Sequence, residues 1–298
     1  MQSGILLIDK PEGPSSASVV QRVKGILGAR KVGHLGTLDP FASGLLPLGV
    51  NEGTKIANIF LTAQKSYSGI IGLGIETDTQ DSTGKIIEVH HVPSLDEQAI
   101  DDLQRAFTGT LWQMPPMFSA LKKGGVRLYH LARQGKSVPR PLREIKIAQL
   151  SLWKLDSAEL GFELVCSKGA YIRTLATDMG RFLGCGAHLK SLRRLSCGWL
   201  TLERAVSLAE FESAKDPKRI PLISLNQALE FICQVTLENS GLSRLKMGQQ
   251  EVLAGLCEPK GKQRLLRLVD SDDNLIALAH WVQGVTGGRW RLLRMFAS

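Results

Sequence analysis

The 298-residue sequence lacks several features that would place it in a special class of protein. No run approaches the roughly 18 consecutive apolar residues of a membrane-spanning helix, and the N-terminus lacks a basic region followed by an apolar stretch and a cleavage site. The five cysteines form no CxxC pair, so we expect reduced thiols rather than a zinc site or a redox couple. Internal repeats and low-complexity tracts are also missing. These absences predict a cytoplasmic protein that does not associate with membranes.

The composition is that of an ordinary globular protein, with 43% hydrophobic and 22% charged residues. A chain of this length can bury a sizeable core and form one large domain plus a small one. The net charge of +9 indicates a polyanionic partner. A positive net charge alone does not distinguish binding to a nucleic acid from binding to acidic lipid, and solubility would explain it as well.

The charges are unevenly distributed along the chain. The ranges 115–143 and 181–194 are rich in Lys and Arg and contain no acid, whereas the range 76–102 is mostly acidic. This asymmetry predicts one basic face and an opposite, solvated acidic face. For either basic run taken alone, a solvated surface explains the residues as well as an RNA contact does.

The segment 33–44, GHLGTLDPFASG, is rich in glycine and carries a single carboxylate, Asp39. It predicts a loop that leads into a buried strand from Leu45 to Val50. Pro40 biases Asp39 toward an extended conformation, and the glycines permit close approaches of the backbone, so the loop can hold Asp39 at the edge of a cleft. On residue types alone, an Asx turn before proline explains Asp39 more simply than catalysis does.

The remaining patterns alternate short strands with capped helices, an element order that is consistent with an α+β fold. One stretch differs, because Met114-Pro115-Pro116-Met117 breaks regular structure and the basic residues up to 141 contain few core candidates. We expect a mobile, functional insertion there. The predicted strands are 4–9, 65–75, 84–90, 145–155, 162–166, 265–269, 275–280 and 290–296. The predicted helices start at Ser15 or Ser16, Gly53, Ser94, Ser207 and Ser224, and the segment 168–175 leads into one more, which ends at Gly184.

Several of these segments resemble, in order and spacing, the motifs of the TruB family of tRNA pseudouridine synthases. The segment 33–44 matches the catalytic motif, although Leu35 stands where many members carry threonine. The other matching motifs are Asp9-Lys10-Pro11-Glu12-Gly13, Lys65-Ser66-Tyr67, Gly169-Ala170-Tyr171-Ile172-Arg173-Thr174-Leu175 and Ser191-Leu192-Arg193-Arg194-Leu195-Ser196-Cys197-Gly198. Together they cover nearly the whole chain.

The resemblance implies three catalytic residues. Asp39 would be the nucleophile, Tyr67 would stack on the target base, and Arg173 would pair with Asp39. Lys10 and Pro11 would support the active-site loop rather than take part in the chemistry. The implied substrate-binding residues are His34, Tyr171, Leu192 and Lys65, together with Lys122, Lys123 and Arg127 of the basic insertion.

The resemblance also implies an architecture. Residues 1–233 would form a pseudouridine synthase fold, a mixed, largely antiparallel sheet with flanking helices, in which residues 115–141 form a thumb that closes over RNA. Residues 234–298 would form a PUA-like domain, a small β-barrel. Its basic residues Lys260, Lys262, Arg289 and Arg291 would hold RNA away from the reacting loop.

The implied activity is conversion of the uridine at position 55, in the T-loop of tRNA, to pseudouridine after the base has been flipped out. The reaction needs no cofactor, metal, guide RNA or obligatory protein partner, and we expect a monomer. Three first steps of Asp39 remain open, namely attack on the sugar, attack on the base and abstraction of a ribose proton. Tyr67 is a candidate to accept the C5 proton at the end.

Two other functions compete with this interpretation. A guide-RNA-dependent pseudouridine synthase would share the Asp39 loop and the terminal domain, but the basic thumb argues against it, because such an enzyme leaves RNA binding to its partners. A non-catalytic RNA-binding or RNA-folding protein would explain the charge. It would not explain why Asp39, Tyr67 and Arg173 each fall in a motif.

Overall fold

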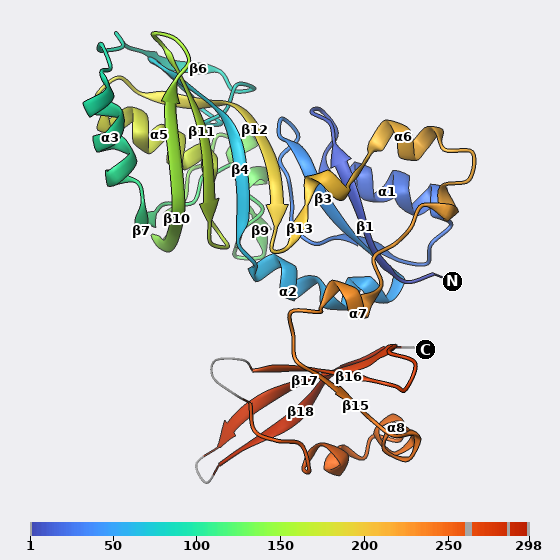
Figure 1. The fold of residues 1–298 in the computed structure, drawn as a ribbon. Coiled ribbons are helices and arrows are strands. Elements are labelled where there is room, and N and C mark those ends of the chain that lie inside the picture. The colour runs from blue at the N-terminus through green and yellow to red at the C-terminus, as the bar shows by residue number, and fades with distance from the viewer. Residues whose placement is uncertain (1, 260–263, 285–286, 297–298) are drawn as a thin grey trace.

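The structure, a computed structural model, describes residues 2–259, 264–284 and 287–296 of the chain. Its larger part is one long sheet with helices packed against it, and the C-terminal residues form a smaller sheet of their own (Figure 1). Lys260 and Lys262 lie outside the described residues. None of the helices in the described ranges has the length and apolar character needed to cross a bilayer.

The large sheet has ten strands in the order β14-β1-β3-β12-β4-β11-β10-β7, with β2 beside β3 and β13 beside β12. Within this sheet, as far as the structure describes it, only the pairs β1·β14 and β3·β12 are parallel, which confirms a mixed, largely antiparallel sheet. The strands are β1 (Gly4–Lys10), β2 (Val32–His34), β3 (Ser43–Val50), β4 (Lys65–Leu73), β7 (Gly109–Gln113), β10 (Arg143–Lys154), β11 (Glu159–Cys166), β12 (Ala187–Cys197), β13 (Leu200–Thr201) and β14 (Val206–Ser207).

Several helices pack against one face of this sheet and share a hydrophobic core with it, whereas α2 and α7 pack in a second cluster with Ile5 and Leu7 of β1. Val23 of α1, Leu103 of α3 and Met179 of α5 all belong to that core. Helix α1 begins after Ser15, whose hydroxyl accepts the Ser18 amide, and it ends at Gly28 with a positive φ of 60°. The helices are α1 (Ser16–Leu27), α2 (Ala57–Thr62), α3 (Glu97–Ala106), α4 (Leu128–Arg133), α5 (Ile172–Phe182), α6 (Leu208–Ser213), α7 (Leu225–Ala228) and α8 (Asn239–Lys246), with 3₁₀ turns η1 (Asn51–Ile56), η2 (Leu202–Arg204), η3 (Pro217–Arg219) and η4 (Gln250–Leu253).

The predicted caps are mostly in place. Ser207 and Glu210 form a full capping box at α6, and Ser224 caps α7. The prediction for α3 was wrong by two residues, because Asp96 rather than Ser94 accepts the Ala99 amide. Asp is as good a cap as Ser, and the chain up to Asp96 is extended, so the nearer acceptor caps the helix.

The insertion 115–141 contains more regular structure than the sequence predicts. Strands β8 (Lys122–Lys123) and β9 (Val126–Arg127) form a hairpin through two glycines with positive φ, and α4 follows directly. Leu128 is buried, and its amide donates to the Leu121 carbonyl. At the other end of the insertion, the Arg140 guanidinium donates to the Pro115 carbonyl, which ties the two ends together.

The C-terminal strands are β15 (Gln234–Thr236), β16 (Leu265–Val269), β17 (Leu275–Gly284) and β18 (Gly287–Met295), which pair in that order. The last three confirm the predicted strands. The sheet is open among the described residues, because no pairing joins β15 to β18, so the predicted closed barrel is not found. A further hairpin, β5 (Ile75–Thr77) and β6 (Ile86–Val89), stands apart from both sheets.

The two sheets are joined by a shared core and by one buried arginine. Val269, Leu278 and Phe296 of the C-terminal part pack in one cluster with Ile5 and Phe60 of the larger part. The guanidinium of Arg267, on β16, is buried and donates to the carbonyls of Asn226, Glu230 and Ile232. The segment around α7 is therefore fastened to the small sheet by hydrogen bonds as well as by apolar contacts (Figure 1).

We expect Arg267→Met to lower the free energy of unfolding by about 3 kcal/mol, because it leaves several buried carbonyls without donors. Urea unfolding of the intact protein measures this loss. Arg289→Met, at an exposed site on β18, is the control and should change the free energy by less than about 0.5 kcal/mol. Equal losses in the two variants would show that Arg267 does not fasten the junction.

Candidate active site

Asp39 lies in the loop between β2 and β3, and the backbone of that loop is held on both sides. The Ser16 hydroxyl accepts the Leu38 amide at 2.8 Å and donates to the Leu38 carbonyl at 2.7 Å. After Asp39, the Ala42 amide donates to the Asp39 carbonyl at 3.2 Å. The carboxylate is thus carried on a backbone with little freedom, and 39% of its side chain is exposed.

Lys10 supports the same loop from β1. Its side chain is fully buried, and the ammonium group donates to the carbonyls of Pro11, Pro14 and Pro40. Burial lowers the pKa of this ammonium to about 8, although the Asp39 charge opposes the shift. These contacts agree with the prediction that Lys10 is a support rather than a chemical group.

Arg173 forms an ion pair with Asp39, with 2.9 Å between its Nε and the Asp39 Oδ2. An arginine in the first turn of a helix normally faces water, yet only 5% of this side chain is exposed. Its remaining donors reach the carbonyls of Thr79 at 2.9 Å and Phe118 at 2.8 Å. The guanidinium is therefore fixed by three chain segments besides its own helix.

Asp81 also belongs to this site, although no sequence pattern indicated it. Its carboxylate is buried, lies 3.6 Å from the Arg173 Nη1 and accepts hydrogen bonds from the Thr79 and Thr83 hydroxyls. The prediction that the acidic range 76–102 forms a solvated face is wrong at this residue. The sequence Asp81-Ser82-Thr83-Gly84 indicates a turn. Nothing in that local pattern shows that the Asp81 carboxylate points inward at Arg173.

A cavity of about 320 Å³ adjoins Asp39 and Arg173. Its wall includes Tyr67 and Lys65 of β4, Tyr171 before α5 and Leu192 of β12. The residues from distant motifs are thus brought together, as the sequence predicts for Asp39, Tyr67, Arg173, Tyr171, Leu192 and Lys65. The space is a polar pocket with aromatic and aliphatic walls, which suits one planar base.

The two tyrosines of the cavity are both protonated at neutral pH. Burial raises the pKa of the half-buried Tyr67 to about 12, although the nearby charge of Arg194 opposes the shift. Burial also raises the pKa of Tyr171. The Tyr171 backbone is clamped by the Gln113 amide, which accepts from its N–H and donates to its carbonyl. Neutral phenol rings suit stacking, whereas a proton-accepting role for Tyr67 requires the substrate to change its surroundings.

Lys65 and His34 have surroundings that the sequence does not reveal. The Lys65 ammonium is buried and donates to the carbonyls of Phe60, Leu61 and Ala63 at the end of α2. His34 is half-buried and is not among the residues that line the cavity, and its Nδ1 has no hydrogen-bond partner among the described residues. Burial lowers the pKa of His34, which favours a neutral imidazole.

Lys122, Lys123 and Arg127 lie on the exposed β8–β9 hairpin, away from the cavity wall. Lys122 and Arg127 face each other across the hairpin. The insertion nevertheless reaches the cavity, because Ser119 and Ala120 line it. The base of the insertion therefore adjoins the Asp39 pocket, and its basic tip is free to contact a polyanion.

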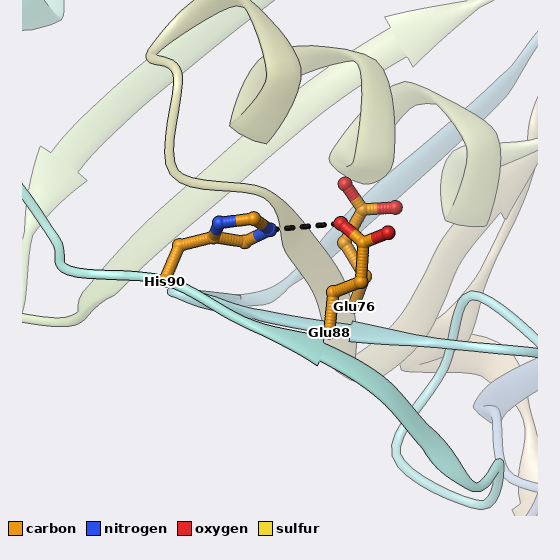
Figure 2. Close-up of side chains that lie close together, drawn as sticks. All are labelled: Glu76, Glu88 and His90. Carbon is orange, nitrogen blue, oxygen red and sulfur yellow. Dashed lines mark hydrogen bonds and ion pairs between the residues drawn. The ribbon is translucent and has the colours of Figure 1, made fainter.

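A second group of titratable residues lies on the β5–β6 hairpin. Glu76, Glu88 and His90 come close enough to share a metal ion, and the His90 Nε2 lies 3.0 Å from the Glu88 carboxylate (Figure 2). The Glu76 carboxylate is also paired with Arg181 at 3.2 Å. This arginine already supplies a positive charge to the group, so the arrangement is explained by ion pairing at the surface.

Comparisons with known proteins agree with the motifs. A model described as "TruB family pseudouridylate synthase (N terminal domain)" matches residues 24–172, and one described as "tRNA pseudouridylate synthase B C-terminal domain" matches residues 173–222. The tRNA pseudouridine synthase B of Geobacter sulfurreducens is 42% identical over 98% of this chain and 99% of its own. The protein of the same name from Nitrosococcus oceani is 49% identical over 70% of this chain and 68% of its own.

The fold is similar to that of a chain in the crystal structure of a Cbf5-Nop10-Gar1 complex, with a TM-score of 0.72 and 24% identity. That match covers 99% of this chain and 85% of the other. The likeness supports the pseudouridine synthase fold alone. Together with the extensive sequence identity to its bacterial relatives, the two matching domain models show that the chain belongs to the TruB family of pseudouridylate synthases.

Proposed function

We propose that this protein converts the uridine at position 55 of the tRNA T-loop to pseudouridine, acting in the cytoplasm as a monomer without guide RNA, cofactor or protein partner. The observation that carries the proposal is the ion pair between Asp39 and the buried Arg173 at the edge of a cavity lined by Tyr67, Tyr171 and Leu192. The names of its relatives, tRNA pseudouridine synthase B, support the substrate class.

The reaction breaks the bond between C1′ of the ribose and N1 of uracil and forms a bond between C1′ and C5. The C5 proton is lost and N1 regains one, so the isomerisation involves no net redox change. A stacked base cannot undergo it, so the uridine must first be flipped out at a cost of a few kcal/mol. Stacking on an aromatic ring such as Tyr67 returns about 1–3 kcal/mol of that cost.

Asp39 would carry the chemical step, whether it attacks the sugar, attacks the base or abstracts a ribose proton. Each of these needs a carboxylate anion, and the charge-assisted contact with Arg173 stabilises that anion. The exposed part of the Asp39 side chain leaves the oxygen accessible to substrate. Tyr171 and Leu192 would bound the base, and His34 would contact the surrounding RNA. Lys65, expected from the family resemblance to bind RNA, would instead support the cavity wall, because its ammonium already donates to three backbone carbonyls.

The basic hairpin supports action without a guide RNA. Lys122, Lys123 and Arg127 are exposed on an insertion whose base lines the cavity, so a stem that contacts them can place its loop at Asp39. Residues 1–233 would supply catalysis, and residues 234–298 would act as a PUA-like RNA-binding domain. Arg289 and Arg291 lie two residues apart on β18 and are both exposed.

The deciding experiment incubates the purified protein alone with an unmodified tRNA transcript and maps pseudouridine. We expect modification at position 55 and none in a transcript with cytidine at that position. Modification only after a guide RNA is added would favour the guide-dependent alternative. RNA binding without any pseudouridine would favour a non-catalytic RNA-binding protein.

Asp39→Asn should abolish pseudouridine formation while retaining fold and tRNA affinity, because it removes the anion at nearly constant shape. We expect kcat to fall by at least about 1,000-fold. Pseudouridine yield under single turnover and tRNA binding measured by filter retention separate the two effects. Turnover near that of the wild type would rule out Asp39 as the nucleophile.

Replacing Lys122, Lys123 and Arg127 by Gln should weaken tRNA binding and reduce its salt dependence. If all three contact phosphates, the slope of log K against log salt should decrease by about 2 to 3. The control variant replaces Lys215, Lys218 and Arg219, three exposed cations at and before η3, by Gln. An unchanged slope in the hairpin variant would show that the thumb does not contact the RNA phosphates.

Reversing two charges on β18, Arg289→Glu with Arg291→Glu, should raise KM for full-length tRNA several-fold and leave kcat unchanged. These side chains would position RNA outside the reacting loop, so they should not affect the chemical step. An isolated T-stem-loop is the control substrate, and its KM should not respond. A fall in kcat on this minimal substrate would contradict the proposed division into catalytic and RNA-binding domains.

A further inference from the structure

Arg194 contacts both arms of the Asp39 loop. Its Nε donates to the Leu45 carbonyl at 2.7 Å, which lies after Asp39. Its Nη1 and Nη2 donate to the carbonyls of Thr37 at 3.2 Å and Gly36 at 3.1 Å, which lie before Asp39. One planar guanidinium thus bridges the entry and the exit of the loop, and its rigid fork fixes their separation.

The backbone of Arg194 also joins this loop to the strand that carries Tyr67. On β12, Arg194 is the register partner of Gly44 in β3 and of Tyr67 in β4. Gly44 has a φ of 98°, and a Cβ at this position would lie 2.4 Å from the Arg194 carbonyl oxygen. The loop is therefore pressed against β12 at one end, and no larger residue fits there.

Arg194 is a buried cation without a carboxylate partner in the described part of the chain. Only 1% of the residue is exposed, and it forms no salt bridge with an acid anywhere in the described ranges. Burying a cation without a carboxylate is costly unless its hydrogen bonds are all made. Here the partners are backbone carbonyls at the two ends of the Asp39 loop. The hydrogen bonds to them offset the cost of burying the charge, and they order the loop at the same time. Arg194 also lines the cavity itself.

The adjacent Arg193 differs from Arg194 in its exposure and in its partner. Its side chain is 41% exposed and pairs with Asp9 at 2.6 Å. Successive side chains of a strand point to opposite faces, so Arg193 lies on the face of β12 away from the cavity. The two arginines are chemically identical neighbours, yet only the Arg194 guanidinium donates to the backbone of the loop, whereas that of Arg193 donates to Asp9.

We propose that Arg194 is a positioning residue that sets where Asp39 stands relative to Tyr67 and hence to the flipped base. The inference rests on the proposed function. Arg173 neutralises the carboxylate from one side, whereas Arg194 fixes the backbone that carries it. Asp39 must lie within about 3–3.5 Å of the reacting atom, and a displacement of 1 Å costs about 100-fold in rate.

The test compares Arg194→Lys and Arg194→Gln with the control Arg193→Lys in the full-length protein. Lys keeps the charge and Gln keeps an amide donor, but neither can bridge three carbonyls in one plane. For both Arg194 variants we expect a fall in kcat of about 100-fold with tRNA affinity within twofold of the wild type. Arg193→Lys should keep kcat within twofold.

Hydrogen exchange of the free protein supplies a readout that does not depend on activity. Amides in the segment 36–45 should exchange faster in the Arg194 variants than in Arg193→Lys, while those of α5 should not change. If a folded Arg194 variant keeps kcat within threefold, or if exchange of the loop is unaltered, the proposal is wrong. If neither Arg194 variant folds, Arg194 serves the fold rather than the loop, which also overturns it.

The same measurements separate this inference from the proposed function. An inactive wild-type protein would overturn the activity, while the exchange comparison would still show whether Arg194 orders the loop. An active wild type with active Arg194 variants would overturn only the inference.

Discussion

The site depends on the ion pair between Asp39 and Arg173. It joins a loop of the first strands to the start of α5, and the arginine is nearly inaccessible to water whereas the aspartate is not. Arg173 does not depend on Asp39 alone, because Asp81 and two carbonyls also contact it. The guanidinium is therefore held independently of Asp39, and the catalytic anion proposed above would need such a fixed counter-charge.

Cations surround this single accessible carboxylate. Lys10, Lys65 and Arg194 are all buried, and each is held mainly by backbone carbonyls. Carbonyl dipoles satisfy the donors without placing further carboxylates near the cavity. The arrangement keeps the cavity positive and leaves Asp39 as the carboxylate exposed at its edge. Such a pocket favours a polyanionic substrate and any negative charge that develops on the base.

The sequence predicted those parts of the fold that depend on local pattern. Residue patterns predicted β4 and β10, and residue types predicted the Ser207 cap, whereas β12 was not predicted. The roles of Asp39 and Arg173 came from family resemblance. The contacts of Asp81 and Arg194 could not be predicted, because both residues contact segments that are distant in sequence. An Arg beside another Arg also carries no local sign of burial. The predicted barrel is not confirmed among the described residues, and the sequence could not decide it, since strand closure depends on pairing that periodicity does not encode.

The thumb and the catalytic pair are physically connected through Arg173. Its Nη2 donates to the Phe118 carbonyl, immediately before the insertion residues Ser119 and Ala120 that line the cavity. The Tyr129 amide donates to the Ser119 carbonyl, so α4 and the basic hairpin are fastened to the same short segment. If RNA contacts the hairpin as proposed, it would act on the same backbone that holds the guanidinium. Because that guanidinium also pairs with Asp39, the hairpin and the Asp39 carboxylate belong to one hydrogen-bonded frame.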